Sequence, residues 1–190
     1  MQPERDGVRS AVFLDRDGVV NATVLRAGRP TAPATLEEFH ILPGVAEALQ
    51  GLAGAGFLLI VATNQPDVAR GLVSRATVEA MHQRLREALP LDDIKACFEV
   101  ETATSDCYKP KPGMLIAAAR EQAIDLSQSY MVGDRWRDVG AGRAAGCFTV
   151  LIDRGYGEPL PEAPDAVCGS LVEAAGIILA HRRGAAARKA

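Results

Sequence analysis

The stretch that decides the fold reads AVFLDRDG, residues 11–18. Its four apolar residues, 11–14, predict a short strand buried on both faces, because a half-exposed strand would alternate apolar and polar residues. The apolar run is followed by Asp15 and Asp17, two carboxylates two positions apart. Such a pair can act on a phosphoryl group, the first carboxylate attacking phosphorus and the second handling the proton of the departing oxygen. Alternatively, both aspartates only form the turn.

Short apolar runs alternate with helical patterns along the rest of the chain. Further strands are predicted at 57–62, 98–100, 130–132, 148–152 and 166–168. Three helices are predicted to begin near Gly44, directly after an N-cap at Thr77, and near Gly113. A short fourth helix is predicted to end at Gly146. A last helix is predicted from 171 to about 179, and no element in the polar stretch from 21 to about 43. The pattern predicts an α/β fold with a Rossmann-like, mostly parallel sheet and helices on both faces.

Length and composition favour one globular domain. The 190 residues are 48% hydrophobic, which excludes a disordered chain, and the net charge of −3 is too mild for a nucleic-acid binder. No apolar run approaches the roughly 20 residues that span a bilayer, and the polar N-terminus carries no signal segment. We therefore expect a cytoplasmic monomer with no membrane partner. Residues 1–9 are expected to be flexible, 10–181 to form the domain and 182–190 to be a disordered basic tail.

Polar residues that follow the other predicted strands are candidates for a site, because ligands of parallel sheets lie beyond the carboxyl ends of the strands. Thr63 and Asn64 can hold phosphate oxygens or simply turn the chain. Lys109, in KPKPG at 109–113, offers a positive charge before a helix N-terminus, or is a solvated loop lysine. Asp134 can complete a magnesium site. Asp138, one helical turn later, can point the same way or only favour the helix dipole.

The order Asp-x-Asp, Thr-Asn, Lys-Pro and Gly-Asp-x-x-x-Asp resembles that of the haloacid dehalogenase superfamily of phosphohydrolases, from residue 11 to about 179. Longer stretches resemble the D-glycero-D-manno-heptose 1,7-bisphosphate phosphatases and their histidinol-phosphate phosphatase relatives. These stretches are FLDRDGVVN (13–21), TNQ (63–65), Ala69-Arg70-Gly71, CYKPKPGM (107–114) and YMVGDR (130–135). The family's members are small and lack a large cap domain, which agrees with the length of this chain.

The resemblance implies a magnesium-dependent phosphomonoester hydrolase that forms an aspartyl-phosphate. It makes Asp15 the nucleophile and Asp17 the general acid and then the base. The resemblance also implies that Mg²⁺ is held by Asp15, the backbone carbonyl of Asp17 and Asp134. Thr63 and Lys109 would stabilise the transferring phosphoryl group. The remaining expected substrate contacts are Asn64, Gln65, Tyr108 and Arg135.

Two departures from the family pattern bear on the ligands. Members commonly carry a zinc loop with Cys-x-His and then Cys-x-Cys before the Lys-Pro motif. Here the second pair reads Ser105-Asp106-Cys107, and only Cys97 and Cys107 lie in the region. A structural zinc site needs four ligands, so no zinc is expected. Tyr108 stands where the family often has an arginine that contacts substrate, so a neutral phenol replaces a guanidinium.

These residues predict a phosphatase for a small sugar phosphate, with the 7-phosphate of the heptose 1,7-bisphosphate as the best candidate. Histidinol phosphate or another sugar phosphate is the alternative substrate. An idle binding scaffold is disfavoured because the nucleophile and the lysine are both present, whereas a phosphotransferase differs from a hydrolase only in its products. The four scattered cysteines do not form a disulfide scaffold and fit a reducing compartment. His82, among polar neighbours on its helix, is expected to be solvated.

Overall fold

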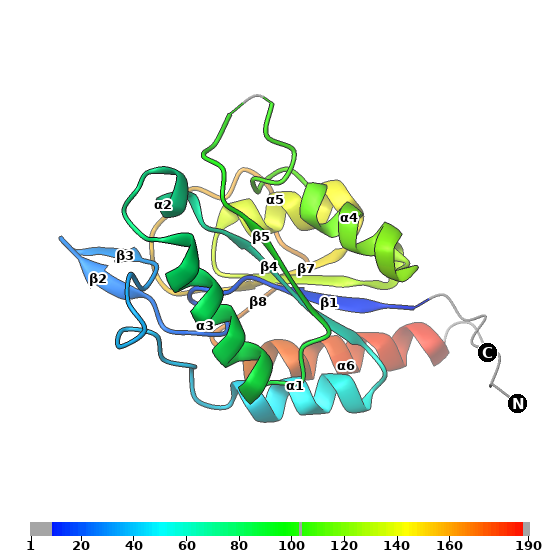
Figure 1. Cartoon of the computed structure of the whole chain (residues 1–190). Coiled ribbons are helices and arrows are strands. Elements are labelled where there is room, and N and C mark those ends of the chain that lie inside the picture. Colours follow the sequence, from blue (N-terminus) through cyan, green and yellow to red (C-terminus); the bar gives the residue numbers. More distant parts are fainter. Residues whose placement is uncertain (1–8, 103, 188–190) are drawn as a thin grey trace, which may run out of the picture.

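A six-stranded parallel sheet forms the centre of the protein (Figure 1). It is seen in a computed structural model that describes residues 9–102 and 104–187. The strand order is β5-β4-β1-β6-β7-β8. The strands are β5 (Asp93–Cys97), β4 (Leu58–Asn64), β1 (Ala11–Leu14), β6 (Tyr130–Gly133), β7 (Phe148–Ile152) and β8 (Ala166–Cys168). The predicted parallel α/β sheet is confirmed, and β1 lies at its centre between β4 and β6.

Helices cover both faces of the sheet, which explains the unbroken apolar run of β1. Val12 and Leu14 belong to the core cluster on one face, whereas Ala11 and Phe13 belong to the cluster on the other. The first face is covered by α1 (Val45–Gly54), α3 (Arg75–Ala88) and α6 (Leu171–Ala187), and the second by α4 (Gly113–Gln122) and α5 (Trp136–Ala145). A short helix α2 (Pro66–Ala69) and a 3₁₀ turn η1 (Leu126–Gln128) complete the elements.

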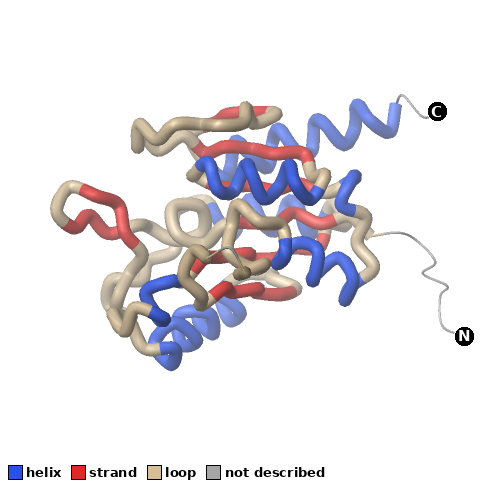
Figure 2. The backbone as a smooth tube through the Cα atoms, turned by 90° about the horizontal axis from the view of Figure 1, so that it is seen from above, coloured by secondary structure: helices blue, strands red, loops and turns tan. Residues whose placement is uncertain are grey.

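A β-hairpin lies within the stretch 21–43, where no element was predicted. Its strands β2 (Val24–Arg26) and β3 (Arg29–Thr31) pair antiparallel, and Figure 2 shows the hairpin projecting from the rest of the chain. The two turn residues, Ala27 and Gly28, both have positive φ, 50° and 74°. This turn type favours Asn-Gly or Asp-Gly, so Ala-Gly gives a weak sequence signal. Leu25 is apolar but exposed, so the hairpin strand lacks the alternation of buried apolar and exposed polar residues that would predict it.

Two predicted boundaries are wrong. The strand expected at 98–100 lies at Asp93–Cys97, an edge strand whose polar residues include Asp93 and Lys95. An edge strand tolerates charges that a central strand excludes, so the apolar-run criterion misses β5, although it finds the other edge strand, β8, at the predicted residues 166–168. Helix α3 is capped by Ser74 instead of Thr77, because the Ser74 hydroxyl accepts a hydrogen bond of 3.0 Å from the Thr77 amide.

The last helix runs well past the predicted end near 179, so the expectation of disorder is wrong for residues 182–187. Helix α6 continues to Ala187 because its final turns are anchored. The Arg182 guanidinium donates to the Ala55 carbonyl at 2.9 Å and lies 4.2 Å from the centre of the Phe57 ring. Arg9 pairs with Ile124 in an isolated bridge, whereas residues 1–8 and 188–190 lie outside the described part of the chain.

Within the described ranges, no helix is both long and apolar enough to cross a bilayer.

Candidate active site

The carboxyl ends of three central strands bring the predicted site residues to one edge of the sheet. Asp15 directly follows β1, and its amide donates to the Val132 carbonyl of β6 at 2.8 Å. On the other side, β1 pairs with β4, which ends at Thr63 and Asn64. A cavity of about 310 Å³ opens here. Six predicted site residues line it: Asp15, Asp17, Asn64, Tyr108, Lys109 and Arg135.

Lys109 forms the centre of the site's charge arrangement. Its buried ammonium donates to Asp15 Oδ1 at 2.8 Å, to the Ala62 carbonyl at 2.7 Å and to Asp138 Oδ1 at 2.6 Å. Burial acts to lower the pKa of this ammonium, but the carboxylates of Asp138 and Asp15 outweigh it and raise the pKa above its ordinary value. Lys109 is therefore a fixed positive charge beside the Asp15 carboxylate.

Asp138 orients Lys109 and also caps its own helix. While Oδ1 binds the ammonium, Oδ2 accepts a hydrogen bond of 3.0 Å from the Arg135 amide at the start of α5. Both oxygens are thus engaged inside the protein, and the residue is buried. The sequence left open whether Asp138 faces the site or serves the helix start, and the structure shows that it does both.

A group of three carboxylates marks the place where a cation fits. Asp15, Asp134 and Asp138 each offer an oxygen, and these oxygens lie within 4.8 Å of one another. Burial, reinforced by Asp15 and Asp138, raises the pKa of Asp134 to about 8. Burial likewise raises the pKa of Asp15 to about 6, against the opposing effect of Lys109. Such crowding of buried negative charge favours a divalent cation as counter-ion.

Asp134 has an oxygen available for such a cation. Its Oδ2 accepts a hydrogen bond of 2.9 Å from the Tyr156 hydroxyl. Its Oδ1 is buried and has no hydrogen-bond partner among the described residues. Buried carboxylate oxygens are normally satisfied, and hard oxygen ligands are what Mg²⁺ requires. The donor set therefore fits a magnesium ion bound through Asp15 and Asp134.

Asp17 is held by three neighbouring side chains. Arg16 forms an ion pair with it at 2.9 Å, Asn21 Nδ2 donates to Oδ1 at 2.9 Å, and Gln65 Nε2 donates to Oδ2 at 2.8 Å. Gln65 also donates to the Thr63 hydroxyl at 2.9 Å. Thr63 and Gln65 are buried and do not line the cavity, so the structure places Gln65 behind Asp17 and not in a position to contact substrate.

His82 is not solvated, contrary to the expectation from its sequence neighbours. It is only 1% exposed, and its Nε2 lies 3.3 Å from Nη1 of the fully buried Arg16. Burial, together with the Arg16 charge, lowers the pKa of His82 to about 4. A neutral imidazole can therefore accept a hydrogen bond from Arg16, which in turn holds Asp17. This contact could not be predicted from sequence, since 66 positions separate the two residues.

Asn64 fixes the backbone of the Lys109 segment. Its Oδ1 accepts from the Lys109 amide at 3.0 Å, and its Nδ2 donates to the Lys109 carbonyl at 3.1 Å. This two-point contact ties the end of β4 to the lysine, across 45 positions of sequence. Asn64 thus lines the cavity and positions the neighbouring charge at the same time.

Comparisons with known proteins agree with this geometry. A family model described as HAD-hydrolase-like matches residues 106–174. A D-glycero-D-manno-heptose-1,7-bisphosphate 7-phosphatase from Thermosynechococcus vestitus is 36% identical, over 91% of this chain and 97% of its own length. A D-glycero-beta-D-manno-heptose-1,7-bisphosphate 7-phosphatase from Pseudomonas aeruginosa is 40% identical, over 81% of this chain and 89% of its own. The chain belongs to the heptose-bisphosphate phosphatase family of haloacid dehalogenase-like hydrolases.

A solved structure of the family shows the same fold. The D,D-heptose 1,7-bisphosphate phosphatase from B. bronchiseptica, complexed with magnesium and phosphate, is 33% identical and aligns with a TM-score of 0.75. The alignment covers 90% of this chain and 99% of that one. The chain therefore aligns with nearly the whole length of that structure.

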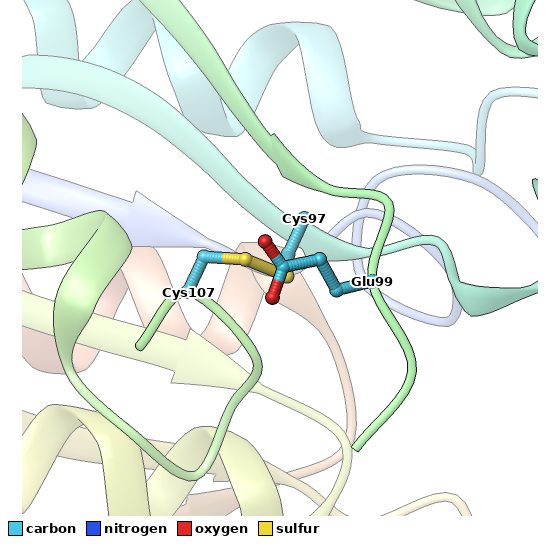
Figure 3. A group of neighbouring side chains, drawn as sticks. All are labelled: Cys97, Glu99 and Cys107. Atoms are coloured by element: carbon cyan, nitrogen blue, oxygen red, sulfur yellow. A yellow bond between two sulfur atoms is a disulfide. The ribbon is translucent and has the colours of Figure 1, made fainter. Parts of the chain in front are cut away.

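This family member has a cysteine bridge beside the lysine motif. Cys97, at the end of β5, forms a disulfide with Cys107, and the Glu99 carboxylate lies next to the two sulfurs (Figure 3). The bridge joins the sheet edge to the segment that carries Lys109. The sequence did not predict this pairing. The absence of zinc stays a prediction, which elemental analysis can test.

The wall of the cavity holds two arginines that were not among the predicted site residues, although Arg70 lies in a stretch that resembles the family. Arg70 and Arg137 line it together with the predicted Arg135. Arg135 is bonded to Glu158 and donates to the Pro30 carbonyl of the hairpin at 3.2 Å. Tyr108 also lines the cavity, and the Arg137 guanidinium lies 5.9 Å from the centre of its ring. Arg137 carries no motif signal, because it falls between the motif residues of the segment 133–138.

Proposed function

We propose that this protein removes the 7-phosphate of D-glycero-β-D-manno-heptose 1,7-bisphosphate by hydrolysis through an aspartyl-phosphate. The observation that carries the reaction class is the pairing of Asp15 with Lys109 in a cavity at the carboxyl ends of the strands. The choice of substrate is supported by relatives of 36–40% identity that are named for this reaction.

In the first step, an Asp15 oxygen attacks phosphorus, and the bond between phosphorus and the sugar oxygen breaks. Asp17, which also lines the cavity, protonates the departing sugar oxygen. Lys109 offsets the negative charge that Asp15 and the phosphate bring together. Arg16, Asn21 and Gln65 hold the Asp17 side chain in place for this transfer.

In the second step, water attacks the phosphorus of the aspartyl-phosphate, and the bond between phosphorus and the Asp15 oxygen breaks. Asp17, now deprotonated, accepts the proton of the water. Inorganic phosphate leaves, and Asp15 is a carboxylate again. Asp138 takes no direct part but holds Lys109 beside the reacting carboxylate throughout.

Magnesium is the cofactor that we propose for this site. Asp15, Asp134 and the backbone carbonyl of Asp17 would hold it, and the unpartnered Oδ1 of Asp134 supports this assignment. When bound, the ion would supply positive charge that offsets the carboxylates and the phosphate.

The test is phosphate release across a panel of sugar monophosphates, sugar bisphosphates and histidinol phosphate, with Mg²⁺ and with EDTA. We expect the heptose 1,7-bisphosphate to have the highest kcat/KM and EDTA to abolish turnover. Asp15→Asn should lower kcat by at least about a thousandfold, since it removes the nucleophile but keeps the shape. The circular dichroism spectrum of Asp15→Asn should match that of the wild type. A variant that keeps more than a few per cent of the activity would rule out the covalent route.

A further inference from the structure

Several positively charged side chains line the cavity beside the carboxylates. Besides Lys109, three arginines line it: Arg70, Arg135 and Arg137. Arg135 is held by Glu158 and the Pro30 carbonyl, and Arg70 forms an ion pair of 3.0 Å with Asp67. Arg137 differs from both, because one nitrogen of its guanidinium is buried without a hydrogen-bond partner among the described residues.

Arg137 has one buried donor without an acceptor. Its Nη2 contacts Glu101 Oε2 at 2.7 Å, but its Nε is buried and has no hydrogen-bond partner in the described part of the chain. A buried guanidinium donor that stays unpaired is unfavourable unless a ligand completes it. The Glu101 side chain is 56% exposed, so this ion pair is weak and can be exchanged for another anion.

Two aromatic rings lie close to the Arg137 guanidinium. Its central carbon lies 4.5 Å from the centre of the Trp136 ring and 5.9 Å from that of Tyr108. Tyr108 immediately precedes Lys109, so the guanidinium borders the same cavity as the lysine. Stacking on aromatic rings keeps the charge of a guanidinium, whose planar edge can donate two parallel hydrogen bonds to an oxyanion once a competing carboxylate leaves.

We propose that Arg137 determines specificity by binding the phosphate of the substrate that is not cleaved, with Tyr108 as its stacking platform. This inference rests on the proposed bisphosphatase function. On this assignment, a residue 29 positions after Tyr108 provides the guanidinium that Tyr108 lacks. Glu101 occupies Arg137 until the substrate phosphate replaces it.

The experiment compares two substrates that differ by one phosphate, the heptose 1,7-bisphosphate and the heptose 7-phosphate. Arg137→Ala should raise the KM for the bisphosphate by roughly tenfold or more, with kcat nearly unchanged, because the contact holds ground state and transition state alike. The KM for the 7-phosphate should change less than twofold. For Arg137→Lys, the KM for the bisphosphate should lie between those of the wild type and Arg137→Ala, since lysine keeps the charge and loses the planar fork.

A second variant separates binding from a structural role. Glu101→Gln releases Arg137 from its partner, so the KM for the bisphosphate should fall, whereas loss of a merely structural ion pair would leave it unchanged or raise it. The matched control is Arg143→Ala, on the same helix, whose side chain pairs with Asp165 outside the cavity. It should leave both KM values as they are.

Each outcome bears on one claim or on both. If wild-type protein turns over the bisphosphate and Arg137→Ala raises both KM values equally or neither, the assignment of Arg137 is overturned and the proposed function stands. If the wild type hydrolyses neither heptose phosphate, the proposed function fails and the assignment of Arg137 fails with it.

Discussion

At the scale of single residues, Gly18 shows how the backbone makes room for the Asp134 carboxylate. Its φ is +90°, a conformation that side chains rarely adopt. A Cβ at this position would lie 1.9 Å from Asp134 Oδ2, the oxygen bound by Tyr156. Only a residue without a side chain allows Asp134 to approach the Asp-x-Asp turn so closely.

Gly18→Ala should therefore weaken Mg²⁺ binding by about 10- to 100-fold, as loss of a ligand's supporting contacts commonly does. Titration calorimetry with Mg²⁺ measures this directly. The matched control is Gly28→Ala in the hairpin, where φ is +74° and nothing lies within 4 Å of the added carbon. Both variants should lose about 1–3 kcal/mol of stability from backbone strain, but only Gly18→Ala should lose metal affinity. Equal affinities in the two variants would contradict this account of Gly18.

At the scale of elements, Arg182 is one of the residues that hold the end of helix α6 in place. Arg182→Ala removes the hydrogen bond to Ala55 and the contact with the Phe57 ring. We expect a loss of about 1–2 kcal/mol, seen as a lower melting temperature with unchanged activity. Arg183→Ala, at the exposed neighbouring position, is the control and should change little. A disordered tail would make the two variants indistinguishable.

Strands with a continuous apolar run could be predicted from sequence, including the edge strand β8, whereas the hairpin and the edge strand β5 could not. The runs around Phe13 and Ile60 are continuous and apolar, so β1 and β4 follow directly. The hairpin and the edge strand β5 face solvent and carry polar residues, so burial leaves no clear pattern in them. The same holds for the site. Asp15 follows a strand and Lys109 precedes a helix, each within a recognisable motif. Arg137 lies in no such motif and becomes a candidate site residue only through its position beside Tyr108.

At the scale of the whole molecule, the carboxylate cluster links stability to pH. In the unfolded chain Asp134 loses its proton near the ordinary pKa of 3.8, but in the fold its pKa is about 8. Between these values the folded state keeps a proton that the unfolded state has lost. Stability therefore falls as pH rises from about 4 to about 8, by at most about 1.4 kcal/mol for each unit of the shift.

Melting curves of metal-free protein, in EDTA, should show this decline for the wild type relative to Asp134→Asn, which keeps the shape without the charge. Added Mg²⁺ should stabilise the wild type more at about pH 8 than at about pH 5, because it takes the place of the proton. It should have a much smaller effect on Asp134→Asn. Parallel curves for the two proteins in EDTA would show that Asp134 is not destabilised by burial.

The segment that joins β5 to the lysine motif separates the proposed catalytic residues into an N-terminal and a C-terminal group. Asp15, the proposed nucleophile, lies before it and Lys109 after it, so we expect neither half to turn over substrate alone. A break after the exposed Glu101 would create a split enzyme, whose phosphate release reports that two fused partners have met. The Cys97–Cys107 bridge spans the break, so thiol reductant would decide whether the halves are tethered or free to exchange.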